Sequence, residues 1–239
     1  MKNIKLLLAV ILIAISARAQ VNVNQVINSV SGGSSGSGLT NDKIVKGLKE
    51  ALTLGTNTAT TNASKVDGFY KNQLIKIAMP PEAKEVDKTV RKLGMSKQAD
   101  DFIKSMNRAA EDASKKAAPI FINAVTKMNI NDGLTILKGS DDAATQYLKN
   151  ATTADLKKEF NPIVKASLNK ANVAKYWNQM AKTYNQVPFV KHVNPNLEDY
   201  VTTKAIDGLF KLIGDEEKKI RKDPAKQVTD ILKQVFGGH

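Results

Sequence analysis

From residue 39 onward, apolar residues recur every three or four positions, and this spacing narrows the possible folds more than any other feature. The clearest stripe follows Thr40 and runs through Ile44, Val45, Leu48, Ala51, Leu52, Gly55 and Ala59. Positions spaced in this way lie on one face of an α-helix. The alternation typical of strands is almost absent, and the one strand-like run, 74–77, is too short to form a sheet. The sequence therefore predicts an all-α protein, a single compact bundle-like domain of about eight to ten helices.

Capping residues and prolines divide this pattern into helices. Thr40 can cap the first helix, and Pro80 followed by Pro81 begins the second. Gly139 ends a later helix, and Pro119 predicts either a kink or two successive helices. The predicted helices cover about 40–60, 81–93, 96–128, 132–138, 140–148, 152–170, 173–184, 197–221 and 224–235.

The first 19 residues have the pattern of a signal peptide. Lys2 and Lys5 precede an unbroken apolar run from Leu6 to Ile15, and Ala17-Arg18-Ala19 provides small residues for cleavage. The apolar run is shorter than the roughly 20 residues that a membrane-spanning helix needs. We therefore expect a signal peptide over 1–19, a flexible tail with a Ser/Gly linker over 20–38 and an all-helical domain over 39–239. The expected location is outside the cytoplasm, in the periplasm first and the extracellular space second.

Composition excludes several classes of chemistry. The chain has no cysteine, which excludes disulfide scaffolds, thiol catalysis, Cys-ligated zinc and iron–sulfur clusters. The two histidines, His192 and His239, have no neighbouring ligand at metal-binding spacing. Gly-rich phosphate loops and the common hydrolase and metalloprotease motifs are also missing from the sequence. We expect no metal site, no cofactor and no catalytic residue identifiable from motifs, and an enzyme is the less favoured interpretation.

The chain is strongly basic. Its formal net charge is +13, or +10 once the signal peptide's three basic residues, Lys2, Lys5 and Arg18, are removed. An exported basic protein meets anionic lipid head groups and cell-wall polymers rather than nucleic acid. We therefore expect an anionic component or a protein of the cell envelope as partner, no nucleic acid and no transmembrane segment in the mature chain. A helical surface merely rich in lysine explains the same charge.

Two groups of charged residues stand out as candidate sites. On the predicted central helix, Arg108 and Glu111 are at i,i+3 spacing beside Asn107, which is typical of a solvated helix face. On the predicted helix over 197–221, Glu217 can pair with Arg221 at i,i+4.

Glu216 is aligned with the apolar stripe of its helix, between Ile213 and Ile220. A carboxylate on a buried face needs a charged or hydrogen-bonding partner. The structural hypothesis is that Glu216 meets Arg108 or Arg91 across a helix contact. The functional alternative makes Glu216 a general acid or a ligand-binding carboxylate at the base of a cleft.

Trp177 and Tyr184 share one helical stripe. At this spacing, aromatic side chains belong to the core more often than to a ligand platform. We therefore expect Trp177 and Tyr184 to belong to the core.

Several short motifs are shared with one bacterial family. In chain order they are Gly47-Leu48-Lys49-Glu50-Ala51-Leu52, Asp67-Gly68-Phe69, Ile77 to Pro80, Met106-Asn107-Arg108-Ala109-Ala110-Glu111, Gly139 with Ala143-Ala144-Thr145 and Tyr147, Phe160-Asn161-Pro162-Ile163-Val164, Tyr200-Val201-Thr202, and Gly208-Leu209-Phe210 leading to Glu216-Glu217, Ile220-Arg221 and Asp223-Pro224. Over nearly all of 39–237 the chain resembles the family catalogued as domain of unknown function 4197. The resemblance implies an exported helical protein with no established activity and no catalytic residues to carry over.

Three functions fit these features. The first is a non-enzymatic module that binds an anionic or amphipathic partner in the cell envelope. The second is a hydrolase of wall glycan or lipid that uses a carboxylate such as Glu216 or Glu111, and glycan hydrolysis would need a second carboxyl group across a cleft. The third is a structural or assembly subunit of an envelope complex, which a large exposed apolar patch would favour.

Overall fold

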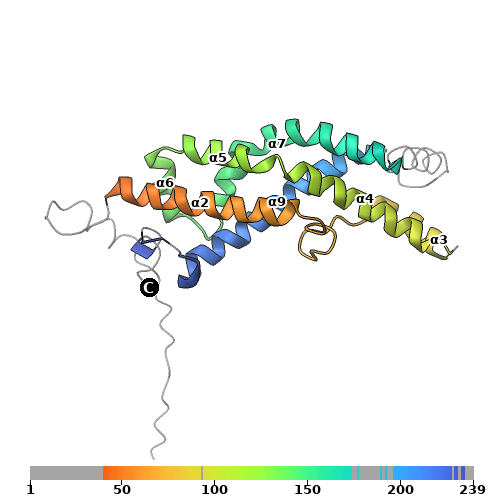
Figure 1. The fold of residues 1–239 in the computed structure, drawn as a ribbon, viewed down its shortest axis with the longest axis horizontal. Helices are drawn as coiled ribbons and strands as arrows, with labels where there is room; N and C mark the ends of the chain where they lie inside the picture. The colour runs from red at the N-terminus through yellow and green to blue at the C-terminus, as the bar shows by residue number, and fades with distance from the viewer. Residues whose placement is uncertain are drawn as a thin grey trace, which may run out of the picture.

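The computed structural model describes residues 40–92, 94–173, 177, 189, 192, 196–227, 229, 230, 233 and 234 (Figure 1). These residues form helices joined by turns and contain no strand, so the all-α prediction is confirmed. In chain order the helices are α2 (Asn41–Ser64), the short 3-10 helix η1 (Pro81–Ala83), α3 (Lys84–Lys92), α4 (Ser96–Ser114), α5 (Ala117–Lys127), α6 (Ile130–Lys138), α7 (Ala143–Lys170), α9 (Leu197–Lys222) and the 3-10 helix η2 (Pro224–Lys226).

The predicted count of eight to ten helices is not confirmed, because the described part of the chain contains seven α-helices. The helices predicted over 140–148 and 152–170 are the single helix α7, in which Thr152 is an interior residue. The Thr152 hydroxyl donates to the carbonyl oxygen of Leu148 at 2.7 Å, so it is satisfied without interrupting the helix. The predicted signal peptide and linker lie outside the described residues, as does most of the helix predicted over 173–184, Tyr184 included. Of the helix predicted over 224–235, residues 228, 231, 232 and 235 also lie outside, and its start is the 3-10 helix η2.

Local signals set several helix ends as expected. The Thr40 side chain accepts a hydrogen bond from the Lys43 backbone N–H at 3.3 Å and caps α2. Gly139 is the C-cap of α6. The chain breaks between α4 and α5 before Pro119, which is the third residue of α5. A backbone N–H in the first turn has no partner within its helix, so proline is tolerated there.

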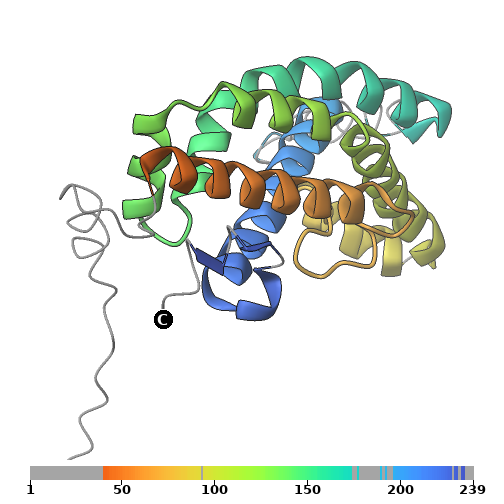
Figure 2. The same cartoon turned by 60° about the vertical axis from the view of Figure 1, so that its left-hand side comes forward.

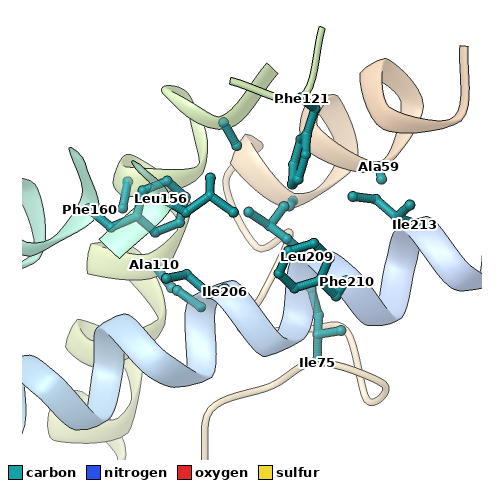
Figure 3. Packing of buried hydrophobic residues seen from close by; sticks show 14 of the residues in the cluster. Ala59, Ile75, Ala110, Phe121, Leu156, Phe160, Ile206, Leu209, Phe210 and Ile213 are labelled. Carbon is teal, nitrogen blue, oxygen red and sulfur yellow. The ribbon is translucent and has the colours of Figure 1, made fainter. Parts of the chain in front are cut away.

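Helix α9 lies at the centre of the fold and contacts α2, α4 and α7 (Figures 1 and 2). Its buried face meets large side chains of α5 and α7 in the core (Figure 3). The rings of Phe210 on α9 and Phe121 on α5 are 5.8 Å apart in an edge-to-face arrangement, a favourable geometry for aromatic pairs. Because α9 is covered on several sides, more of its circumference is buried than one apolar stripe would indicate.

The segment between α2 and η1 is a series of turns that packs against α9. Phe69 is fully buried there and lies on Gly208. A Cβ atom on Gly208 would be 2.7 Å from Cε1 of the Phe69 ring, so the close approach requires glycine at this position. This contact anchors one end of the turn segment beside the charged residues of α4.

Candidate functional site

The six candidate residues separate into two groups and one outlier. Asn107, Arg108 and Glu111 lie on α4 and hold the turn segment that precedes η1; we call them the α4 cluster. Glu217 and Arg221 lie on α9 and hold the start of α7; we call them the α7 cap. Glu216 belongs to neither group.

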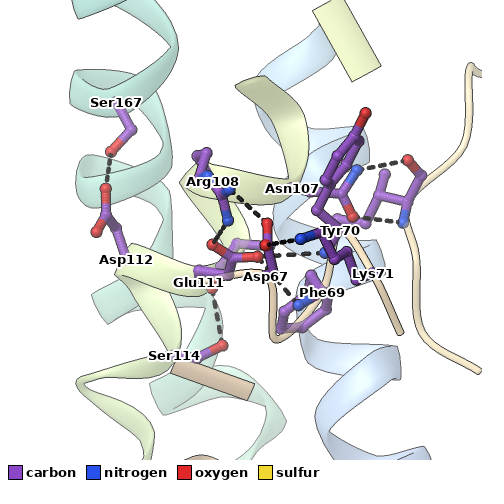
Figure 4. Close-up of polar contacts among 12 residues, drawn as sticks. Asp67, Phe69, Tyr70, Lys71, Asn107, Arg108, Glu111, Asp112, Ser114 and Ser167 are labelled. Atoms are coloured by element: carbon purple, nitrogen blue, oxygen red, sulfur yellow. Dashed lines mark hydrogen bonds and ion pairs between the residues drawn. The ribbon is translucent and has the colours of Figure 1, made fainter. Parts of the chain in front are cut away.

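The α4 cluster binds the backbone of the turn segment (Figure 4). One carboxylate oxygen of Glu111 accepts hydrogen bonds from the backbone N–H groups of Phe69 at 3.1 Å and Tyr70 at 3.2 Å. The Asn107 amide accepts from the N–H of Ile77 and donates to its carbonyl, both at 2.8 Å. These bonds replace the β-ladder or helix bonds that the segment lacks, and satisfy buried backbone groups.

Arg108 completes this arrangement. Its guanidinium donates to the second oxygen of Glu111 and to Asp67, both at 2.5 Å. Lys71 also pairs with Asp67 at 2.8 Å. The hydrogen bond from Lys71, followed by that from Arg108, holds the pKa of the Asp67 carboxyl below its ordinary value.

The prediction that these α4 residues form a solvated helix face is wrong for two of them. Asn107 is fully buried, and the Glu111 side chain is 4 % exposed. The i,i+3 pair of Arg108 with Glu111 does form, but the turn segment covers it. Helical periodicity within α4 cannot reveal a cover that comes from a segment some 40 residues earlier in the chain.

The α7 cap provides a carboxylate from one helix to the N-terminus of another. Glu217 accepts hydrogen bonds from the N–H of Ala144 at 3.0 Å, the N–H of Thr145 at 2.8 Å and the Thr145 hydroxyl at 2.7 Å. Ala144 and Thr145 belong to the first turn of α7, whose N–H groups have no partner within the helix. Arg221 donates to Glu217 at 2.9 Å and to the carbonyl of Ile136 on α6 at 3.1 Å. The predicted pairing of Glu217 with Arg221 is therefore confirmed.

The hypothesis that Glu216 meets Arg108 or Arg91 is wrong. Glu216 is partly exposed and pairs with Lys219 at 2.8 Å, whereas Arg91 pairs with Asp87 and Asp100. Glu217 is the buried carboxylate, with a side chain 5 % exposed. The buried face of α9 contains Ile213 and Ile220, as predicted, but the glutamate on this face is Glu217 and not Glu216.

The hydrogen bonds of Glu111 and Glu217 fit a structural role for both carboxylates. Both oxygens of Glu111 and both oxygens of Glu217 accept hydrogen bonds from protein groups. Glu217 and Arg221 also line a cavity of about 20 Å³, room for about one water molecule. A cavity of this size cannot hold a sugar ring or a lipid.

A larger pocket lies elsewhere, between α3, α4 and the end of α7. It has a volume of about 500 Å³, and we call it the α3–α4 pocket. Most of its lining is apolar; the main side chains are Met79, Val86, Met95, Phe102, Val173 and Trp177. The sequence pattern did not predict this pocket, because its walls come from four separate segments.

Trp177 is buried, as predicted, at 2 % exposure. Its ring centroid lies 5.7 Å from that of Phe102. The indole Nε1–H is buried and has no hydrogen-bond partner among the residues that the structure describes. A buried donor without a partner is unusual in a folded protein and is costly to leave unmet.

Two further observations bear on chemistry. Across the described residues, the structure contains no group of three or more His, Cys, Asp or Glu side chains that could hold a metal ion. None of the helices in the described ranges has both the length and the hydropathy that crossing a membrane requires.

Comparison with protein-family models gives a match over most of the chain. A family model described as "Protein of unknown function (DUF4197)" matches residues 38–237. No curated protein and no solved structure matches the chain.

Proposed function

The chain belongs to the DUF4197 family of proteins of unknown function, as its motifs predicted, and from its own geometry we propose that it is a non-enzymatic binding protein. In this proposal, the α3–α4 pocket holds the apolar part of an amphipathic molecule of the cell envelope. The protein is exported, in accord with the predicted signal peptide, and meets this molecule outside the cytoplasm.

The α3–α4 pocket carries the proposal. Its volume of about 500 Å³ falls within the range of roughly 300–1,000 Å³ that is usual for small-molecule sites. Met79 and Met95 line it beside the rings of Phe102 and Trp177. Methionine side chains are flexible and polarisable, so such a lining adapts to apolar chains of different shape.

The indole N–H of Trp177 has no partner in the part of the chain that the structure describes, and this supports a ligand with a polar atom near its apolar chain. An oxygen of a carboxylate, ester or hydroxyl group would accept a hydrogen bond from Nε1 and remove the cost of the unmet donor. A purely apolar ligand would not.

The hydrolase alternative has less support from the carboxylates. Glu111 and Glu217 are engaged by backbone N–H groups and arginines, and Glu216 pairs with Lys219. A glycosidase needs two carboxyl groups facing a bond in an open cleft. The assembly-subunit alternative has no specific observation in its favour.

A fluorescence titration tests the proposal, because Trp177 is the only tryptophan of the chain. Decanol, an uncharged amphiphile, is expected to change its emission saturably. Ala171→Phe, at an exposed position on the pocket wall, should weaken binding about tenfold by filling the space, since lost apolar contact of a few methylene groups has this magnitude. Ala151→Phe, at an exposed position of α7 away from the pocket, is the matched control.

The control variant should bind decanol like the wild type. No saturable change in the wild type, or equal binding by the two variants, would overturn the proposed function.

A further inference from the structure

Three lysines line a second hollow, on the side of α9 that faces the turn segment. This hollow has a volume of about 300 Å³ and lies between residues 74–78 and α9. Lys204 and Lys211 are two helical turns apart on α9, and Lys76 faces them from the turn segment. We call Lys76, Lys204 and Lys211, together with Tyr200, the basic groove.

The basic groove has an excess of positive charge. Asp207 is the one carboxylate in its lining, which leaves a net charge of +2. Within the described residues, none of the three lysines forms an ion pair, whereas lysines elsewhere, such as Lys71 and Lys219, do. An excess of like charge in one hollow attracts an anion.

Aromatic rings hold two of these lysines in place. The Lys76 ammonium lies 4.6 Å from the ring centroid of Tyr70, and that of Lys204 lies 6.0 Å from the ring of Tyr200. Cation–π contacts of this kind orient an ammonium group without neutralising its charge. Tyr200 also donates from its hydroxyl to the carbonyl of Ala78 at 3.2 Å, which fixes the turn segment against α9.

The basic groove and the α3–α4 pocket both border a third, intermediate hollow. Tyr200 and Lys204 also line an intermediate hollow of about 190 Å³, and Trp177 is in the walls of both this hollow and the α3–α4 pocket. The stretch 77–80 follows the same course: Ile77 and Ala78 line the groove, and Met79 and Pro80 line the other two spaces. The apolar pocket and the basic groove therefore adjoin the same intermediate hollow, with which each shares wall residues.

From this juxtaposition we propose that the basic groove binds the anionic headgroup, a carboxylate or a phosphate, of an amphiphile whose chain occupies the α3–α4 pocket. The inference rests on the proposed function and adds the charge of the ligand to it. It also explains why lysines without ion pairs are placed beside an apolar pocket.

A matched pair of ligands separates the charge from the chain. Decanoate and decanol have the same length, and Trp177 emission reports both. Lys204→Gln combined with Lys211→Gln should weaken decanoate binding about fivefold, the size expected for two exposed charge contacts, and change decanol binding by less than about twofold. Lys157→Gln combined with Lys158→Gln, which removes the same charge from exposed positions of α7, should affect neither ligand.

Two further measurements vary the salt concentration and add inorganic phosphate as a competitor. High salt should weaken decanoate binding and leave decanol binding unchanged, because mobile ions screen exposed charge. Inorganic phosphate, which has the charge but no chain, should compete poorly with decanoate.

Three outcomes would contradict one or both of these proposals. Equal loss of decanoate binding in both double variants would overturn the basic groove while leaving the proposed function standing. Efficient competition by inorganic phosphate would assign the groove to a free anion and overturn the amphiphile. If neither ligand binds the wild type, both proposals fail.

Discussion

Replacing Glu217 with glutamine tests whether the α7 cap holds three helices together. The carboxylate of Glu217 faces only donors: two backbone N–H groups and the Thr145 hydroxyl on α7, and the guanidinium of Arg221. A glutamine amide keeps the shape of the side chain but has one oxygen and one NH₂ group. In the native position, the NH₂ group would face a backbone N–H of Ala144 or Thr145, donor against donor.

The magnitude follows from burial. One backbone N–H left without an acceptor costs about 1–3 kcal/mol when buried. The Arg221 side chain, 12 % exposed, also loses its ion pair with Glu217. Removal of one member of a buried ion pair typically costs about 3–5 kcal/mol. Because Arg221 retains its bond to the Ile136 carbonyl, we expect Glu217→Gln to lower the free energy of unfolding by about 2–4 kcal/mol. For a chain of this size, that corresponds to a melting temperature lower by about 5–15 °C.

The neighbouring residue provides the control. Glu216→Gln makes the same chemical change one position earlier, where the carboxylate is partly exposed and pairs with Lys219, which also pairs with Asp215. A loss of less than about 1 kcal/mol is expected there. Urea unfolding followed by far-ultraviolet circular dichroism measures both variants. If Glu216→Gln were as destabilising as Glu217→Gln, the assignment of Glu217 as the buried cap would be refuted.

Two further predictions concern the turn segment. Gly208→Ala should destabilise the fold by about 1–3 kcal/mol, because its Cβ atom would lie 2.7 Å from the buried Phe69 ring. Gly214→Ala, whose Cβ atom would be 3.5 Å from its nearest neighbour, should be neutral or stabilising by up to about 1 kcal/mol. Thermal melting of the two variants compares them. Asp67→Asn should be less stable than the wild type at neutral pH, and the difference should vanish on acidification. The pKa of Asp67 is lower in the folded state than its ordinary value, so its ionised carboxylate stabilises the folded state above about pH 4. This stabilisation is lost as the pH falls through the folded-state pKa. Urea unfolding midpoints of both proteins across pH 2–7 measure the difference.

Contrary results would be informative for each. Equal melting of the two alanine variants would mean that Phe69 does not pack on Gly208 in solution. An unchanged gap between Asp67→Asn and the wild type down to the most acidic condition would mean that the carboxylate is not held ionised by Lys71 and Arg108.

Much of the helical layout follows from local sequence. The capping hydroxyl of Thr40, the glycine at 139 and the break before Pro119 act within a few residues of their own position. The predicted pair of Glu217 with Arg221 also depends only on helical spacing, and it forms. Local rules therefore predicted the all-α class and several helix ends.

Where prediction failed, a distant segment decided the outcome. A predicted helix begins at Thr152, yet this residue lies in the interior of α7 and is buried by the rest of the fold. Glu216 and Glu217 differ by one position, or about 100° around α9, and only the placement of α7 determines which of them is buried. The α3–α4 pocket and the basic groove were not predicted, since they are assembled from segments up to about 100 and about 140 residues apart in the chain, respectively.

Local sequence patterns were enough to predict the helical class, the ends of several helices and the family, because capping, periodicity and motifs depend on neighbouring residues. The arrangement of the helices in space determines that Glu111 and Asn107 are buried beneath a turn segment, and that an apolar pocket and a lysine-lined groove adjoin the same intermediate hollow. The physical reason is that burial and charge pairing depend on which surfaces meet, and helical spacing does not specify the partner surface.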